Sequence, residues 1–244
     1  MHNQQNNQQL NEGLRATDLK EMVHDVFEVD SFRSKMGEDQ DIVVLGFHVQ
    51  EKNPAIDLME FIEDNDLVNP IIIGHSMGGK TVMQFGLSFP GIAQKIIVVD
   101  IAPKFYPVHH TNILAGLNSV DLSSIQSRND ANEHMKRFEE NEGIRQFLLK
   151  NLYRNSEGLF AWKINLPVIT KNIDVVGHEL FVKNACETTT FFIKGADSHY
   201  IQPEDERYIA EIFPNFELIE IPHAGHWVQA DQPETFIQVL KEIL

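Results

Sequence analysis

Cysteine and long apolar stretches are scarce in this chain of 244 residues. Its single cysteine, Cys186, has no second cysteine to pair with, which excludes an intramolecular disulfide. The chain contains no uninterrupted run of about 18 apolar residues, and its N-terminus has no apolar segment of the kind that marks a secretory signal. We therefore expect a cytoplasmic protein without a membrane-spanning helix.

Positive charge is also in short supply, because 20 Lys and Arg residues stand against 36 Asp and Glu residues, for a formal net charge of −16. Such a chain repels nucleic-acid phosphates and anionic membrane surfaces, so we expect neither as a partner. The histidines lack metal-ligand spacing: His109 and His110 are adjacent, and no H-E-x-x-H motif occurs. We expect no metal and no cofactor.

The most informative segment begins after residue 70. Three β-branched residues, Ile71–Ile73, lead into the Gly-x-Ser-x-Gly motif of residues 74–78, and a helix-compatible stretch follows over residues 80–88. A buried strand, a sharp turn and a helix in this order are the context of a nucleophile elbow, which holds a serine at the tip of a strained turn. We predict that Ser76 is the nucleophile and that the backbone N–H of Met77 helps to bind an oxyanion.

A serine hydroxyl is a weak nucleophile and requires a base. Residues 216–221 are typical of a short strand, residues 222–227 of a loop, and residues 233–244 of an amphipathic helix that opens with a proline. His226 lies in this loop near the end of the chain, where the order nucleophile, acid, base places the base. His223 competes with it, but its position directly after a proline, next to the strand, favours a structural role.

Two aspartates compete to orient the histidine. Asp100 ends the apolar run of residues 95–99, and Asp197 follows the run of residues 190–196. Each comes after an expected strand, so each lies at the edge where open α/β sheets bind ligands, and either could accept a hydrogen bond from the imidazole. The residue pattern alone leaves the two open.

Four segments together resemble the α/β-hydrolase superfamily, and within it a branch of small bacterial acyl-ester and acyl-CoA hydrolases and their mitochondrial abhydrolase relatives. The segments are G-H-S-M-G-G-K at 74–80, D-I-A-P at 100–103, G-I-R-Q-F-L-L at 143–149 and G-H-W at 225–227. The resemblance implies an α/β fold, namely a mostly parallel sheet flanked by helices, with a helical cap.

The resemblance also implies an acid. In this branch the acid follows the strand after the nucleophile helix, which is Asp100 here. The more usual acid position of the superfamily falls on Ser198, and Asp197 is one residue out of register with it. We therefore favour Asp100 as the residue that orients His226.

The resemblance divides the chain into segments. We expect residues 59–103 and 187–244 to form the hydrolase core, and residues 104–186 to form a cap whose apolar side chains pack it to the core and line an acyl pocket. Residues 13–58 form an atypical N-terminal segment. Residues 1–12 include a Gln/Asn-rich tract that cannot bury a core, so we expect a disordered tail.

The N-terminal segment lacks the His-Gly-x-x-Gly loop with which this branch supplies a second oxyanion N–H. Its pattern predicts a helix over residues 14–26 and strands over residues 26–32 and 42–49. The charged turn between them, residues 35–41, is short enough to favour an antiparallel hairpin.

Two functions follow from these observations. In the first, the chain is a serine carboxylesterase or thioesterase that hydrolyses a small-molecule acyl ester or acyl thioester through an acyl-enzyme. In the second, it is a hydrolase-fold binding or interaction protein whose catalysis is impaired. A substitute oxyanion donor could come from Gly46 or Phe47; without one, turnover falls by about 10²–10³. We favour the first function, with a rate lowered in this way, and make no prediction of the oligomeric state.

Overall fold

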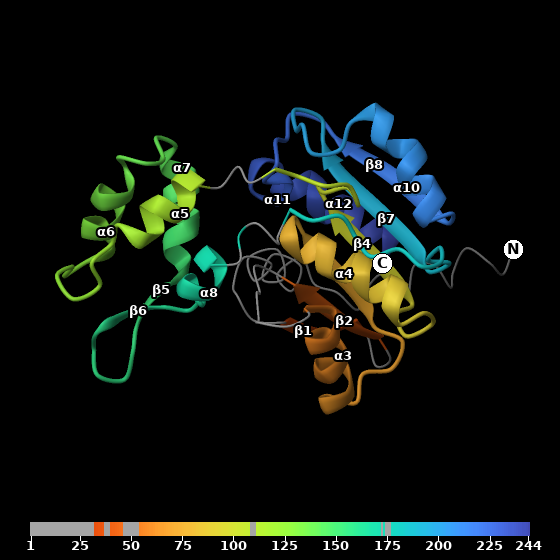
Figure 1. The fold of residues 1–244 in the computed structure, drawn as a ribbon, viewed down its shortest axis with the longest axis horizontal. Helices are drawn as coiled ribbons and strands as arrows, with labels where there is room; N and C mark the ends of the chain where they lie inside the picture. Colours follow the sequence, from red (N-terminus) through yellow and green to blue (C-terminus); the bar gives the residue numbers. More distant parts are fainter. Residues whose placement is uncertain (1–31, 37–39, 46–53, 108–110, 172, 174–176) are drawn as a thin grey trace, which may run out of the picture.

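A computed structural model describes residues 32–36, 40–45, 54–107, 111–171, 173 and 177–244. Within these ranges, a six-stranded sheet with its helices lies beside a smaller, mainly helical unit (Figure 1). The strands are β1 Phe32–Met36, β2 Gln40–Leu45, β3 Ile71–His75, β4 Lys95–Val99, β5 Leu152–Arg154, β6 Phe160–Trp162, β7 Thr189–Gly195 and β8 Phe216–Ile221. The helices are α3 Pro54–Asp64, α4 Met77–Ser88, α5 Thr111–Asn118, α6 Arg128–Met135, α7 Glu142–Leu148, η2 Leu149–Asn151, α8 Leu166–Lys171, η3 Pro203–Asp205, α10 Glu206–Ile212, α11 Val228–Asp231 and α12 Pro233–Ile243.

The large sheet has the strand order β1-β2-β3-β4-β7-β8. Only its β1–β2 pair is antiparallel, and β2, β3, β4, β7 and β8 run parallel to one another. The mostly parallel sheet is therefore as predicted. Since parallel strands end at the same edge, the residues that follow β3, β4, β7 and β8 come together there, at the position where open α/β sheets bind ligands.

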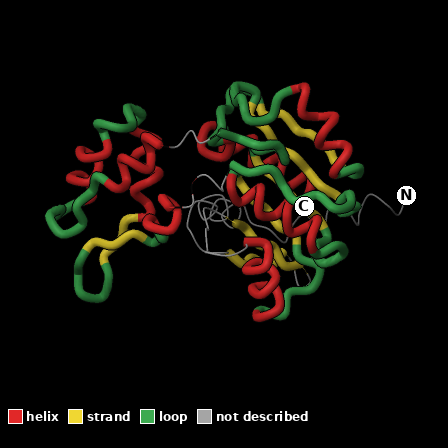
Figure 2. Tube along the Cα trace, in the orientation of Figure 1, coloured by secondary structure: helices red, strands yellow, loops and turns green. Residues whose placement is uncertain are grey.

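Helices cover both faces of this sheet (Figure 2). On one face, buried residues of α3, α4 and α10 pack with alternate residues of the strands, including Ile72, Ile96 and Phe192. On the other face, Phe236 and Leu240 of α12 pack with the intervening strand residues, including Ile73 and Ile97. Both faces of the central strands are buried, which explains why β3 and β4 are continuously apolar. The amphipathic helix predicted over residues 233–244 is confirmed as α12.

The first two described strands form the predicted antiparallel hairpin, but the predicted boundaries are wrong. Strand β1 spans residues 32–36, which were expected to end one strand and begin a charged turn, and β2 starts at Gln40. Strand β1 lies at the edge of the sheet, where charged residues are common because they discourage pairing with another chain. The helix expected over residues 14–26 lies outside the described residues.

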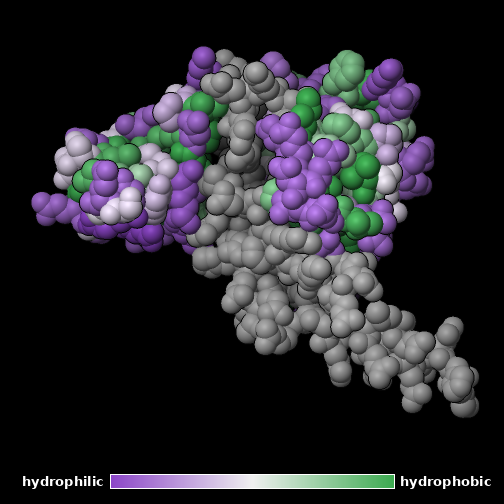
Figure 3. All heavy atoms as spheres, turned by 90° about the horizontal axis from the view of Figure 1, so that it is seen from below, coloured by the Kyte–Doolittle hydropathy of each residue, from purple (hydrophilic) through white to green (hydrophobic). Residues whose placement is uncertain are grey.

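The second unit is inserted between β4 and β7. We call its residues 111–171 the cap; it consists of helices α5 to α8, η2 and the two-stranded sheet β5–β6, a sheet that the sequence did not predict. The cap has its own buried cluster, which includes Leu117, Met135 and Leu152. Many hydrophilic residues lie along the outer surface of this unit, at the left of Figure 3. None of the helices in the described ranges has the length and apolar character needed to cross a bilayer.

Candidate active site

Ser76 lies at the tip of a tight turn between β3 and α4. Its backbone has φ 53° and ψ −114°, a left-handed conformation that costs energy for a residue with a side chain. Hydrogen bonds hold the turn on both sides, because Ser76 N donates to Val99 O at 2.9 Å and Lys80 N donates to Ser76 O at 3.1 Å. A Cβ atom on Gly74 would lie 2.2 Å from Gly78 O, so the strand and the helix approach each other too closely for any other residue at position 74.

His226 faces this serine from the loop after β8. Its Nε2 lies 3.0 Å from Ser76 Oγ, within hydrogen-bonding distance. The competing residue, His223, has an exposed side chain and φ 58°, and its carbonyl oxygen accepts a hydrogen bond from Gln232 Nε2. The structure thus places His226 beside the predicted nucleophile and leaves His223 at the surface.

Asp100 completes the chain of hydrogen bonds. Its Oδ2 lies 2.8 Å from His226 Nδ1, and the residue is fully buried. A proton on Nδ1 satisfies the carboxylate and leaves Nε2 free to accept from Ser76 Oγ, so this network assigns the tautomer of the imidazole. Asp197 is exposed, and its backbone N–H donates to Ala224 O at 2.9 Å. The structure brings Asp100 to the imidazole and places the Asp197 side chain at the surface.

Burial raises the pKa of the Asp100 carboxyl to about 6. Hydrogen bonds counteract this shift and favour the charged form: Ser198 Oγ donates to Oδ2, and Gly195 N donates to Oδ1 at 3.2 Å. Nearby His75 and Lys194 also lower the pKa of this carboxyl. The hydrogen bonds from Ser198 and Gly195 therefore help to keep the buried Asp100 carboxyl in its charged form.

Ser198 is a site residue whose role the sequence reasoning missed. It is buried, and its hydroxyl binds the carboxylate that stands at the end of β4. A signal was present in the sequence, because Ser198 occupies the usual acid position of the superfamily, whereas the predicted acid, Asp100, follows a different strand. A hydroxyl at that position fits, since the ends of β4 and β7 are adjacent and Asp100 N donates to Ile193 O at 2.8 Å.

Aromatic side chains fix the histidine loop. His75 Nε2 donates to His226 O at 2.8 Å, which ties the loop to the residue before the serine. The ring of Tyr200 stacks on the His226 imidazole, with centroids 3.8 Å apart and planes inclined by 15°. Trp227 contacts Phe147 of the cap, at a centroid distance of 4.6 Å. His75 of β3 and the ring of Tyr200 thus hold the loop and the imidazole of His226 in place. Trp227, the next residue, connects this loop to the cap.

Lys80, the last residue of the G-H-S-M-G-G-K motif, links helix α4 to both connections between sheet and cap. Its Nζ donates to Lys104 O and, at 3.1 Å, to His178 O. These carbonyls belong to the segments that leave β4 and return towards β7, and the segments are also joined by Tyr106 N donating to Gly177 O at 2.7 Å. Burial lowers the pKa of Lys80 to about 7, an effect that nearby Glu179 partly offsets.

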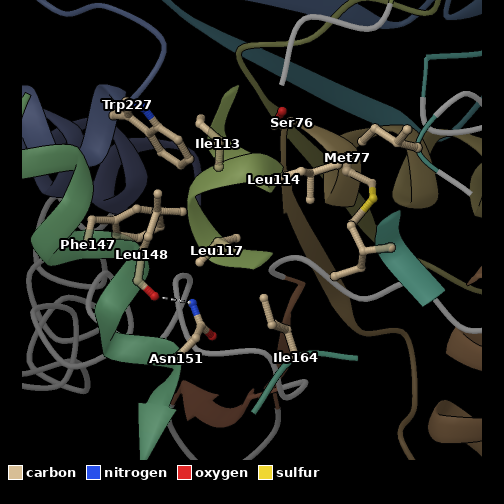
Figure 4. Close-up of a pocket in the computed structure, with 12 residues that line it drawn as sticks. Ser76, Met77, Ile113, Leu114, Leu117, Phe147, Leu148, Asn151, Ile164 and Trp227 are labelled. Atoms are coloured by element: carbon tan, nitrogen blue, oxygen red, sulfur yellow. Dashed lines mark hydrogen bonds between the residues drawn. The ribbon is translucent and has the colours of Figure 1, made fainter. Parts of the chain in front are cut away.

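A pocket lies between Ser76 and the cap (Figure 4). The cap contributes aliphatic side chains from α5, such as Leu114 and Leu117, while Met77 and Trp227 contribute from the core. Its lining is almost entirely apolar, so it suits a hydrocarbon group next to the serine hydroxyl.

Met77 is the first residue of α4, where backbone N–H groups have no partner within the helix. This position is compatible with the predicted role of the Met77 N–H as an oxyanion donor, which stays a prediction. The second donor proposed at Gly46 or Phe47 lies outside the described residues and also stays a prediction. Within the described ranges, no group of three or more His, Cys, Asp or Glu side chains is arranged to hold a metal ion.

The class of this protein follows from three features: a mostly parallel sheet with a strained turn at Ser76, His226 in the loop after the last strand, and a cap inserted between β4 and β7. Together they are typical of α/β hydrolases. Comparison with known proteins agrees. The model of the family described as "alpha/beta hydrolase fold" matches residues 55–233. This chain belongs to the α/β-hydrolase family.

Its relatives include enzymes named for ester chemistry. The mouse sn-1-specific diacylglycerol lipase ABHD11 is 32% identical over 77% of this chain and 63% of the relative. The Escherichia coli esterase YbfF is 32% identical over 78% of this chain and 73% of the relative. The match covers 63% of the mouse relative and 54% of the zebrafish relative, so this chain corresponds to only part of the length of each.

Solved structures agree on the fold. A marine microorganism esterase superposes with a TM-score of 0.76 and 40% identity, over 81% of this chain and 79% of that one. An esterase of M. tuberculosis superposes with a TM-score of 0.59 at 14% identity, over 95% of this chain and 99% of that one, and shows the fold alone. The predicted α/β-hydrolase fold is therefore confirmed.

Proposed function

We propose that this chain is a serine ester hydrolase that cleaves small-molecule acyl esters through an acyl-enzyme. The observation that carries the proposal is the continuous series of hydrogen-bonding distances from Ser76 Oγ through the His226 imidazole to the Asp100 carboxylate, 3.0 Å and 2.8 Å long. A base within reach of the nucleophile, itself oriented by a buried acid, is the arrangement that nucleophilic acyl transfer requires.

The reaction has two halves. Ser76 Oγ attacks the acyl carbonyl carbon while its proton passes to His226 Nε2, and the Met77 N–H stabilises the resulting oxyanion. The tetrahedral intermediate collapses when the imidazolium gives this proton to the departing alcohol oxygen, leaving an acyl group on Ser76. Water then attacks the acyl-enzyme with His226 again as base, and the carboxylic acid is released.

The substrate follows from the pocket and from the relatives. Apolar side chains of the cap would hold the acyl chain beside Ser76. The names of the relatives, which are esterases and a diacylglycerol lipase, favour an oxygen ester over a thioester. The alternative, a binding protein with impaired catalysis, rests on the missing His-Gly-x-x-Gly loop. We favour the enzyme because Ser76, His226 and Asp100 lie within hydrogen-bonding distance of one another in series.

Hydrolysis of a series of 4-nitrophenyl acyl esters tests the proposal. Ser76→Ala should lower kcat by about 10⁶, the loss seen when the serine of a catalytic triad is removed. Ser88→Ala, which changes an exposed serine at the other end of the same helix, is the matched control. If Ser76→Ala retains kcat within tenfold of the wild type, the proposal is wrong.

Chain length supplies a second readout from the same substrates. Each methylene buried in the pocket contributes about 0.8 kcal/mol, or roughly fourfold in kcat/KM. We expect kcat/KM to rise by this factor for successive acyl lengths and then to level off where the pocket ends. A flat profile from the acetyl ester onward would mean that the acyl chain does not bind in this pocket.

A further inference from the structure

Asn151 is an amide among the apolar side chains that line the pocket. It ends η2 in the cap, and only 7% of its surface is exposed. In Figure 4 it lies at the opposite side of the view from Ser76, beyond Leu148 and Leu117. A group bound at Asn151 is therefore remote from the reacting carbonyl and close to the far end of an acyl chain.

The orientation of this amide is fixed by a backbone carbonyl. Asn151 Nδ2 donates to Leu148 O at 3.3 Å, and a carbonyl can only accept, so the nitrogen must face Leu148. The amide oxygen is the remaining polar atom. Within the described part of the chain, Asn151 Oδ1 is buried and has no hydrogen-bond partner. A buried acceptor without a donor is unfavourable, so a ligand that brought a donor to this oxygen would gain the missing hydrogen bond.

We propose that Asn151 Oδ1 accepts a hydrogen bond from a hydroxyl group on the acyl chain of the substrate, so that the enzyme prefers hydroxyacyl esters to unsubstituted esters of the same length. The inference rests on the proposed function, because it requires an acyl chain that extends from Ser76 into the pocket.

The chemistry of the pocket favours a hydroxyl over other donors. The described lining residues carry no charged side chain, so an ammonium group would lose its hydration without gaining a counter-ion. An amide N–H would bring a carbonyl with it, so two polar groups rather than one would have to be satisfied in an almost entirely apolar pocket. A hydroxyl is the smallest neutral group that satisfies the oxygen.

The expected preference for hydroxyacyl esters arises because saturated and hydroxylated acyl chains leave Asn151 Oδ1 in different states. A saturated chain that fills the pocket leaves Asn151 Oδ1 unpaired, whereas a hydroxyl at the right carbon supplies the missing hydrogen bond. One such bond to a buried acceptor corresponds to about 10- to 100-fold in kcat/KM.

The test compares pairs of 4-nitrophenyl esters that differ by one hydroxyl, placed in turn at each carbon from the third to the last. In the wild type, at least one hydroxy ester should exceed its unsubstituted partner by about 10- to 100-fold in kcat/KM. Asn151→Leu should abolish this preference, while Leu117→Met, which changes the lining without changing its polarity, should retain it. The inference is overturned if no hydroxyl position is preferred in the wild type, or if the preference survives in Asn151→Leu.

Binding separates this inference from the proposed function. Calorimetry on Ser76→Ala with a hydroxy fatty acid and its unsubstituted partner requires no turnover, and we expect tighter binding of the hydroxy acid that is lost in Ser76→Ala/Asn151→Leu. Equal binding of the two acids overturns the role of Asn151, even if Ser76-dependent hydrolysis of plain esters upholds the esterase. Should Asn151→Leu fail to fold, as judged by circular dichroism, Asn151→Met takes its place in both experiments, with the same results expected.

Discussion

Replacing Asp100 with asparagine tests how the site uses its buried carboxylate. The carboxylate accepts from His226 Nδ1 and Ser198 Oγ on Oδ2 and from Gly195 N on Oδ1. An asparagine whose oxygen keeps the Gly195 bond presents an NH₂ group to the imidazole, so Nδ1 must accept and Nε2 must carry the proton. Nε2 then cannot take a proton from Ser76, and kcat/KM should fall by up to about 10⁴, which is roughly 5.5 kcal/mol.

The same substitution should leave the fold intact. Burial raises the pKa of Asp100 from 3.8 to about 6, so the folded state holds its proton more tightly than the unfolded state. Ionisation therefore destabilises the fold as pH rises from about 4 to 6, by about 3 kcal/mol once the group is fully charged. Asparagine does not ionise and tolerates the positive φ of 50° at this position.

The assay is kcat/KM for one acyl ester together with thermal unfolding at pH 7.5. Asp100→Asn should lose activity but melt no earlier than the wild type. The control Asp197→Asn changes an exposed side chain, so it should leave kcat/KM unchanged and alter the free energy of unfolding by no more than about 0.5 kcal/mol. A large loss in Asp197→Asn with little change in Asp100→Asn would refute the assignment of the acid.

Two further predictions follow from the contacts around the site. Ser198→Ala removes a hydrogen bond that lowers the pKa of Asp100, so the acidic limb of kcat/KM should move to higher pH; an unchanged pH profile would exclude this role. Lys80→Met removes the hydrogen bonds to Lys104 O and His178 O and should lower the free energy of unfolding. Because burial lowers the pKa of Lys80 to about 7 from 10.5, the unfolded wild-type chain binds a proton between these pH values that the folded chain lacks. The wild type should therefore gain stability relative to the variant as pH rises through this window, as measured by urea unfolding at several pH values, and a constant difference would contradict the assignment.

Much of the core could be predicted because its signals are local. The apolar run of Ile71–Ile73 and the glycines around Ser76 specify a strand, a tight turn and a helix within one short segment. The spacing of apolar residues in 233–244 specifies a helix that covers one face of the sheet. Each of these elements depends on residues that are neighbours in sequence, so the pattern is sufficient.

The remaining features depend on contacts between distant segments. The choice between Asp100 and Asp197 depends on where each side chain lies after its strand. Asp100 is buried against the His226 imidazole, whereas Asp197 is exposed, and the apolar run before each aspartate does not contain this difference. The stacking of Tyr200 on His226 joins two loops in the same way. Strand β1 was misplaced because an edge strand pairs on one side only, so the charged segment 32–36 lacks the apolar pattern by which buried strands are recognised.

The central claim is that Ser76 is an activated nucleophile, and labelling with a fluorophosphonate tests it most directly because this reagent requires no knowledge of the substrate. Trypsin should release residues 53–80 as one peptide, and Ser76 is the only serine, threonine or tyrosine within it. We predict a single adduct on this peptide in the native protein, absent after heat denaturation and absent in Ser76→Ala. An adduct on another peptide, or undiminished labelling of Ser76→Ala, would contradict the account.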